Sequence, residues 1–326
     1  MKGGIAVLSD CSSFCVDQSN QEQQKHGTAA FPAACYLDDL EQSSVSWHWH
    51  EELEVIVVAE GEALVVVGTR TYIVRAGDGL LISTGTLHSC QAEPGSGCRL
   101  HSLVFHPRLV GGSMESIFYQ KYVLPVTENL AGDGIFFHMD MPWQAEALLA
   151  AEAAWQAGVQ EPACYELRMR SCLSELLAAV CAHLPANRTA PNAKSLRKEK
   201  RIKQMLRFIQ EHYAEELNTA SIAAAASISE SECLRCFHAV IKTTPIQYLR
   251  EYRIERAARF LSEGSDHITE IAARCGFQDV SYFTKTFRRL KGCTPKEYRQ
   301  THPPAARPPH LLTEPLNADR KVLAKA

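Results

Sequence analysis

The sequence lacks any run of about 18 apolar residues, so we expect no membrane-spanning helix and no membrane partner. The apolar stretch near the first residue is too short for a secretory signal peptide, and we therefore expect a cytoplasmic protein. The Cys11/Cys15 and Cys233/Cys236 pairs have no second pair at the spacing of a zinc ribbon. The twelve cysteines are scattered, which favours reduced, buried thiols over disulfides or a metal cluster.

The first part of the chain is also poor in positive charge. Residues 1–190 hold 10 Lys and Arg against 22 Asp and Glu, a net charge of −12. Residues 191–300 hold 20 against 13, a net charge of +7, and residues 301–326 hold 4 against 2, a net charge of +2. An acidic N-terminal part followed by a basic C-terminal part favours a nucleic-acid-binding module joined to a part that does not touch nucleic acid. The length of 326 residues suits two domains.

The most informative stretch runs from Ile268 to Arg299. It predicts a short helix, a turn at Gly276, and a second helix that Asp279 caps at its N-terminus. Three apolar side chains share one face and should be buried: Phe283, Phe287 and Leu290. The exposed residues expected to bind DNA are Ser281, Tyr282, Thr284, Lys285 and Arg288. Hydroxyls and cations on one helix suit a DNA major groove, although an ordinary amphipathic surface helix shows the same periodicity.

The order of residues in this stretch is more specific than its periodicity. Residues 271–299 read Ile-Ala-x-x-x-Gly-Phe-x-Asp-x-Ser-Tyr-Phe-x-x-x-Phe-Arg-Arg-x-x-Gly-x-Thr-Pro-x-Glu-Tyr-Arg. This closely resembles the signature of the AraC/XylS family of bacterial transcription regulators. The resemblance implies a DNA-binding domain with two helix-turn-helix motifs, the first of them roughly 50 residues upstream.

A matching upstream motif is present. Residues 221–226 predict a short helix, Ser227 a turn, and Ser229 the N-cap of the next helix. The inward residues are Cys233, Phe237 and Val240, and the outward residues expected to bind DNA are Ser231, Leu234, Arg235 and His238. The family usually has glycine at Ser227, and a serine at positive φ costs about 1 kcal/mol. Leu234 either meets a thymine methyl group or packs against the protein.

The family's geometry implies how the two motifs would bind. Residues 244–257 match the long helix that joins the motifs, so the two recognition helices should enter successive major-groove segments about 34 Å apart. Arg235 and Lys285 are the best candidates for contacts with guanine or phosphate, and Arg288 for phosphate alone.

The N-terminal part predicts short strands. Residues 45–50 and 98–105 alternate, residues 53–58 are β-branched, and two further runs flank a hairpin turn at residues 68–70. Short strands with regular turns are typical of a sandwich or barrel. The spacing of His48, His50, Glu54 and Gly61 resembles the first cupin motif. Residues 77–88 resemble the second, with His88 as the last ligand and Thr84 where proline is usual.

The cupin resemblance leaves two roles for this frame. In metal-binding cupins, three histidines and one glutamate hold a divalent ion. AraC-type regulators usually use the same frame as a pocket lining, so we expect an effector pocket at His48, His50, Glu54 and His88, without a bound metal or other cofactor and without catalytic residues. Trp47 and Trp49 alternate with the histidines, and only one of the two sets can face that pocket.

We therefore predict an α+β protein with two domains. The N-terminal domain is a cupin-like β-barrel (jelly roll) with following helices, and the C-terminal domain is all-α with two helix-turn-helix motifs. The predicted parts are a flexible arm (1–30), the sensor domain (31–140), a helical region (141–185), a linker (186–200), the DNA-binding domain (201–300) and a disordered tail (301–326). The apolar face of residues 164–184 either packs onto the barrel or forms a dimer interface.

The predicted function is that of a sequence-specific transcription regulator of the AraC type. Its partners would be double-stranded promoter DNA, a small-molecule effector such as a sugar, a second copy of the chain, and RNA polymerase. Two alternatives remain: a cupin metalloenzyme with an appended DNA-binding domain, and a constitutive DNA-binding dimer without an effector.

Overall fold

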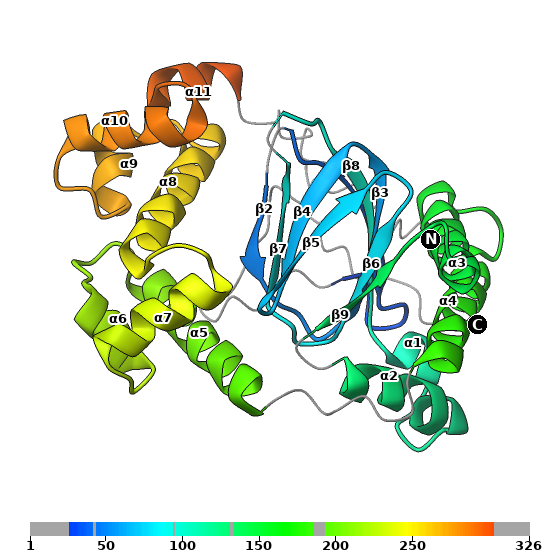
Figure 1. Ribbon diagram of the computed structural model, residues 1–326. Coiled ribbons are helices and arrows are strands. Elements are labelled where there is room, and N and C mark those ends of the chain that lie inside the picture. Colours follow the sequence, from blue (N-terminus) through cyan, green and yellow to red (C-terminus); the bar gives the residue numbers. More distant parts are fainter. Residues whose placement is uncertain (1–25, 42–43, 94, 131–132, 185–192, 303–326) are drawn as a thin grey trace, which may run out of the picture. The chain divides into compact units, whose positions relative to one another are not determined.

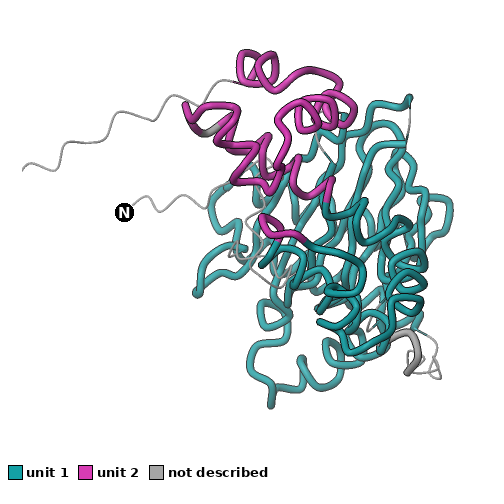
Figure 2. Tube along the Cα trace, turned by 90° about the vertical axis from the view of Figure 1, so that its left-hand side faces the viewer, with its two compact units in different colours: residues 1–212, 217–249 teal, residues 213–216, 250–326 magenta. Residues whose placement is uncertain are grey.

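The computed structural model describes residues 26–41, 44–93, 95–130, 133–184 and 193–302. The chain divides into two compact units, one of residues 1–212 and 217–249 and the other of residues 213–216 and 250–326 (Figure 2). The predicted arm up to residue 25 and the predicted tail from residue 303 lie outside the described residues. Among the helices of the described part, none combines the length and the apolar character needed to cross a membrane.

The first unit contains two antiparallel sheets (Figure 1). One has the strand order β1-β8-β3-β6-β9 and the other β2-β7-β4-β5. The strands are β1 (Ala33–Asp39), β2 (Val45–His48), β3 (Leu53–Glu60), β4 (Glu62–Val67), β5 (Arg70–Arg75), β6 (Gly79–Ile82), β7 (His88–Ala92), β8 (Arg99–Phe105) and β9 (Gly134–Phe137). The predicted strands and the hairpin turn at Gly68 are confirmed. The two sheets form a jelly-roll sandwich, and the barrel is not closed because each sheet keeps its own edge strands.

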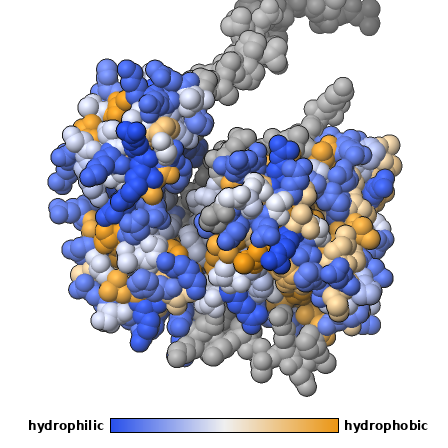
Figure 3. Space-filling view, turned by 45° about the horizontal axis from the view of Figure 1, so that its top comes forward, coloured by the Kyte–Doolittle hydropathy of each residue, from blue (hydrophilic) through white to orange (hydrophobic). Residues whose placement is uncertain are grey.

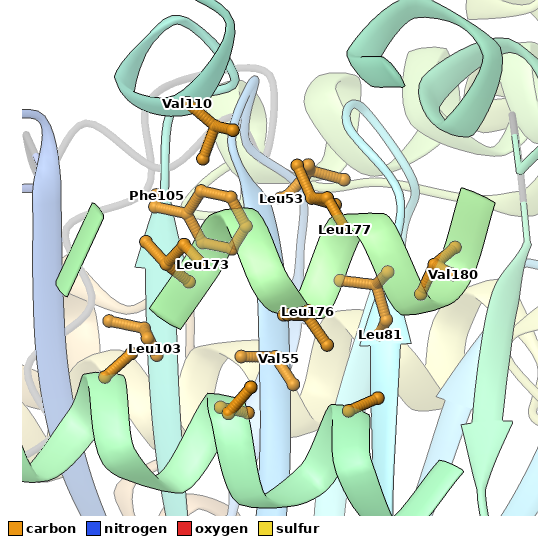
Figure 4. Close-up of a cluster of buried hydrophobic side chains, with 14 of the residues drawn as sticks. Leu53, Val55, Leu81, Leu103, Phe105, Val110, Leu173, Leu176, Leu177 and Val180 are labelled. Atoms are coloured by element: carbon orange, nitrogen blue, oxygen red, sulfur yellow. The ribbon is translucent and has the colours of Figure 1, made fainter. Parts of the chain in front are cut away.

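Burial on both faces explains the unbroken apolar run of β3. Leu53 and Val55 belong to a hydrophobic core that also includes residues of the helices (Figure 4). Ile56 and Val58 belong to a second core made by strands of both sheets. Because side chains alternate along a strand, Glu54 shares the face of Ile56 and points into the space between the sheets.

Helices before and after β9 cover the five-stranded sheet. They are α1 (Arg108–Gly111), η2 (Tyr119–Val123), α2 (Leu124–Asn129), α3 (Pro142–Gln160) and α4 (Tyr165–His183). The apolar face of α4 packs onto the sheet through Leu173, Leu176, Leu177 and Val180, which are buried against Leu81, Leu103 and Phe105 (Figure 4). These side chains therefore serve the core of the chain itself, and dimerisation stays a prediction.

The first unit ends with α5 (Ala193–His212), α6 (Thr219–Ala225) and α7 (Glu230–Val240). Helix α5 begins inside the predicted linker, because residues such as Arg197, Lys198 and Glu199 have high helix propensity. Residues 185–192 of that linker lie outside the described part of the chain.

Helix α8 (Pro245–Glu263) crosses the division between the units, and the second unit continues with α9 (Ile268–Arg274), α10 (Val280–Lys291) and α11 (Pro295–Thr301). Phe283 and Phe287 are buried against apolar residues of α8 and α9, as predicted. The prediction that Leu290 is buried is wrong, since 36% of its surface is exposed. Thr286 is buried in its place, because the inward face of α10 turns toward residues 283, 286 and 287.

The described cysteines are all free thiols. Cys35, Cys90, Cys98, Cys233, Cys236 and Cys275 are buried, and burial raises the pKa of Cys35 to about 12. Cys233 and Cys236 are buried residues of α7 and form no disulfide. Cys11 and Cys15 lie outside the described residues.

Candidate functional site

The first candidate site is the helix-turn-helix of α6 and α7. Ser227 has φ +54°, the left-handed conformation in which glycine is favoured. The Ser229 hydroxyl accepts a hydrogen bond from the Glu232 amide at 3.3 Å, which confirms its predicted role as N-cap. The turn geometry is therefore that expected for the motif, and Ser227 adopts it at a conformational cost.

Replacing Ser227 with glycine should stabilise the protein by about 1 kcal/mol, because it removes the cost of a side chain at positive φ. Urea unfolding of the purified chain would measure the change. Ser231→Gly, at an exposed position inside α7, is the matched control and should destabilise by ~0.5–1 kcal/mol through its lower helix propensity. A lower stability for the Ser227 variant would contradict the proposed strain.

The outward face of α7 carries the predicted residues. Ser231, Leu234, Arg235 and His238 are exposed, whereas Cys233, Phe237 and Val240 are fully buried. Leu234 is 37% exposed, which favours an outward orientation over packing against the core. An apolar side chain so placed is available to a thymine methyl group.

Arg235 has a partner that sequence reasoning missed. Its guanidinium forms an ion pair with Glu232, one turn earlier on α7. The same carboxylate accepts a hydrogen bond from Arg201 of α5 at 3.2 Å. Glu232 and Arg235 are three residues apart on one helix, and this spacing could have predicted the ion pair from the sequence. Glu232 thus holds Arg235 at the helix surface, and a DNA phosphate or guanine would have to share or replace this carboxylate.

The second motif is formed by α9 and α10 in the second unit. Gly276 has φ +77°, and the Asp279 carboxylate accepts a hydrogen bond from the Tyr282 amide at 2.8 Å. The exposed residues are Ser281, Tyr282, Lys285 and Arg288, and Thr284 is half-buried. The Thr284 hydroxyl donates to the Val280 carbonyl at 2.9 Å, so it can only accept a hydrogen bond from DNA.

The second candidate site lies between the two sheets of the first unit. His48 ends β2, His88 begins β7, and these two residues face each other in the strand register. His50 follows β2, and Glu54 comes from β3 of the opposite sheet. All four side chains are buried, and their candidate ligand atoms lie within 4.8 Å of one another. The structure therefore brings together all four residues that the sequence predicted for one site.

Glu54 is at the centre of this cluster. Its Oε2 lies 3.1 Å from His50 Nε2 and 2.9 Å from His88 Nε2. Burial opposes ionisation of the carboxyl, but its contacts with the two histidines outweigh burial and hold the Glu54 pKa well below its ordinary value. Burial also lowers the His48 pKa well below its ordinary value, so that ring is neutral. The site thus pairs an anionic carboxylate with histidines that are mostly out of contact with water.

Other groups complete the surroundings of the cluster. The Ser102 hydroxyl of β8 donates to Glu54 Oε1 at 2.6 Å. His26 is buried, its ring centre lies 5.2 Å from that of His50, and its Nδ1 lies 2.9 Å from the Tyr36 hydroxyl. Sequence reasoning missed all three of these residues. The pairing of β1, β3 and β8 places Tyr36 and Ser102 near the cluster, and His26 precedes β1 and reaches the cluster beside Tyr36.

Trp47 and Trp49 are half-buried and point to the other face of their strand, so the histidines are the set that faces the interior. The Lys203 ammonium of α5 lies 4.7 Å from the centre of the Trp49 ring. Nearby, the Glu199 carboxylate of α5 accepts a hydrogen bond from the Leu87 amide at 3.1 Å, and Lys203 donates to the Gly85 carbonyl. Helix α5 therefore contacts the residues directly beside His48, His50 and His88.

Comparisons with known proteins match two regions of the chain. Residues 32–139 match the AraC-like ligand binding domain, and residues 222–301 match a helix-turn-helix domain. The uncharacterized HTH-type transcriptional regulator YdeC of Bacillus subtilis (strain 168) is 29% identical over 88% of this chain and 98% of its own length. The HTH-type transcriptional activator RhaS of Enterobacter sp. (strain 638) is 35% identical, but over only 31% of this chain and 36% of RhaS.

A solved AraC-type regulator from Chromobacterium violaceum is 29% identical, with a TM-score of 0.31 over 34% of this chain and 96% of that chain. The family matches define a DNA-binding transcription regulator with an N-terminal ligand-binding domain. The chain belongs to the AraC/XylS family, and the predictions of its fold class and regulatory function are confirmed at that level.

Proposed function

We propose that an effector bound at the cluster of His48, His50, Glu54 and His88 controls how tightly the two helix-turn-helix motifs bind promoter DNA. The contacts with DNA are proposed to come from the outward residues of α7 and α10: Ser231, Leu234, Arg235, His238, Ser281, Tyr282, Thr284, Lys285 and Arg288. The net charge of +7 over residues 191–300 supports electrostatic attraction to DNA. Such a protein acts in the cytoplasm, where its promoter is.

The observation that carries this proposal is the contact between α5 and the residues beside the cluster. Glu199 is buried and accepts the hydrogen bond from Leu87, the residue next to His88. On the other side of the contact, α5 packs with α6 and α7, the first helix-turn-helix motif. A change of a few tenths of an ångström at His88 would therefore act on the helix that supports this motif.

Footprinting on the DNA beside the protein's own gene tests the proposal. The expected result is protection of two adjacent major-groove segments on one face of the DNA, with an extent or affinity that changes when the effector is added. Protection that never changes with any metabolite or ion would instead favour the constitutive DNA-binding dimer.

Glu199→Ala should tighten promoter binding by the protein without effector, roughly 2- to 10-fold, because a hydrogen bond worth about 0.5–1.5 kcal/mol no longer holds α5 in its DNA-free arrangement. Fluorescence anisotropy with the footprinted DNA measures the affinity. Glu211→Ala is the control, since Glu211 lies on the same helix and forms an ion pair with Arg207 of α5 itself. Equal affinities for wild type and the Glu199 variant would refute the restraining role.

The other partners are also proposed. Large apolar side chains are exposed at Phe118 and Leu167, which line a groove of about 400 Å³ with Tyr122, and a second copy of the chain would cover them. On the face shown in Figure 3, hydrophobic residues form separate groups among hydrophilic ones.

RNA polymerase is the expected partner on the promoter. The relatives are transcription regulators, which supports a binding role without catalysis.

A further inference from the structure

The ring nitrogens of the three clustered histidines have an ordered arrangement. In each ring, Nδ1 lies against a main-chain carbonyl: His48 at 2.9 Å from Ser46, His50 at 3.2 Å from Glu52, and His88 at 2.7 Å from Thr86. A carbonyl oxygen only accepts hydrogen bonds, so each Nδ1 carries the proton. In a neutral ring, Nε2 is then the nitrogen with the lone pair. A backbone partner on the second ring nitrogen is the usual arrangement for histidines that bind metal ions.

The Glu54 carboxylate is oriented in the same way. Its Oε2 approaches Nε2 of His50 and of His88, at 3.1 and 2.9 Å. Its other oxygen accepts the hydrogen bond from Ser102, which fixes the plane of the carboxylate. Glu54 Oε2 and the Nε2 atoms of His50 and His88 thus converge on one point, as the ligand atoms of a single ion do.

The space among the four side chains suits an ion better than an organic molecule. The ring centres of His48 and His88 are 4.1 Å apart, and those of His50 and His88 are 5.2 Å apart. The candidate ligand atoms lie within 4.8 Å of one another. Bonds of about 2.0–2.2 Å to one ion place two ligand atoms at most ~4.4 Å apart, so the side chains would need to move by only a few tenths of an ångström to bind it. His26 packs its ring against His50 and adds to the enclosure.

We propose that His48, His50, Glu54 and His88 bind one divalent transition-metal ion, and that this ion is the effector sensed by the N-terminal domain. Three imidazole nitrogens and one carboxylate oxygen are ligands suited to Zn²⁺, Fe²⁺, Ni²⁺ or Cu²⁺ rather than to Ca²⁺ or Mg²⁺. The second half rests on the proposed function, because the ion would act on DNA binding through the contact of Leu87 with Glu199. This proposal differs from the sequence-based expectation of a metal-free pocket lining.

The test starts with the full chain, stripped with a chelator and kept reduced. Titration with Zn²⁺ in a calorimeter should show one tight ion per chain, and Co²⁺ should give a visible absorption spectrum without a thiolate charge-transfer band. His88→Ala and Glu54→Gln should each weaken this binding at least 100-fold. Ser102→Ala leaves all four ligands in place and should weaken it about 10-fold, because it releases the ligating carboxylate.

His138→Ala is the matched control, since His138 is a half-exposed histidine of the same unit outside the cluster. Melting temperatures without metal identify any variant that fails to fold, and the Ser102 variant keeps the test decisive if the ligand variants do fail. Zn²⁺ bound equally by wild type and a folded His88→Ala variant, or a thiolate band with Co²⁺, would place the ion on cysteines and overturn the site.

Promoter affinity with and without Zn²⁺ separates the two halves of the proposal. A change in affinity that the Glu54 variant loses supports the ion as effector. One tight ion in the cluster with unchanged promoter affinity overturns the effector role while the metal site stands. A lack of ion binding overturns the site and leaves the proposed function to the footprinting experiment with organic metabolites.

Discussion

Gly276→Ala is expected to destabilise the second helix-turn-helix motif by about 2–4 kcal/mol and to abolish specific promoter binding. Gly276 has φ +77°, where any Cβ is strained. The added Cβ would also lie 2.8 Å from the Tyr213 carbonyl oxygen and 2.9 Å from that of Ala214, closer than real contacts of this kind. Urea unfolding of the full chain and anisotropy with promoter DNA measure the two effects.

The same substitution would disturb Arg253. The new Cβ would meet its guanidinium at 2.8 Å, and this group donates to the carbonyls of Tyr213 at 2.6 Å and of Glu215 at 2.7 Å. Charge-assisted hydrogen bonds of this kind contribute about 1.5–3 kcal/mol each. Burial also lowers the Arg253 pKa from its ordinary value, so the carbonyls stabilise a guanidinium that is partly withdrawn from water.

Gly292→Ala separates the cost of the left-handed backbone conformation from the cost of the steric clash at Gly276. Gly292 has φ +76° at the C-terminus of α10, and an added Cβ would meet nothing within 4 Å. This control should cost only the ~1 kcal/mol of the left-handed backbone conformation and should leave promoter binding nearly intact. Similar losses of stability in the two variants would mean that the close approach at Gly276 is unimportant.

Arg235→Ala is expected to weaken binding to the best operator by about 1–3 kcal/mol and to remove the preference at one base pair. Arg235 is 71% exposed on the outward face of α7, and it forms an ion pair with Glu232 of the same helix. If Arg235 left the Glu232 carboxylate to bind a guanine, it would still make a charge-assisted contact. The strength of that contact would depend on which base is present. Anisotropy with a set of operators, each changed at one base pair, measures the preference.

Arg207→Ala is a suitable control for Arg235, since Arg207 is an exposed arginine of α5 whose partner is Glu211. It changes the net charge equally, so it should produce only the small, sequence-independent loss expected from one cation. If Arg235→Ala weakened every operator to the same extent, Arg235 would contact phosphate and not a base.

The DNA-binding motifs were predictable because their signals are local. The caps at Ser229 and Asp279 act within one helical turn, and the left-handed turn residues at Ser227 and Gly276 act within a few residues. The wrong prediction for Leu290 shows the limit of such local signals. Periodicity identified the buried face of α10, but packing against α8 and α9 decided where that face ends.

For the N-terminal domain, the sequence by itself determined the strands, the turns and the four residues of the cluster. His48, His50 and Glu54 are close in sequence, so their alternation already placed them on one face. Only the tertiary structure decided how His88 closes the cluster, because the paired residues His48 of β2 and His88 of β7 are 40 positions apart in the chain. It likewise placed Ser102, His26 and Glu199. Each of these depends on contacts between distant segments, and periodicity carries no information about which strands pair or which helix packs beside them.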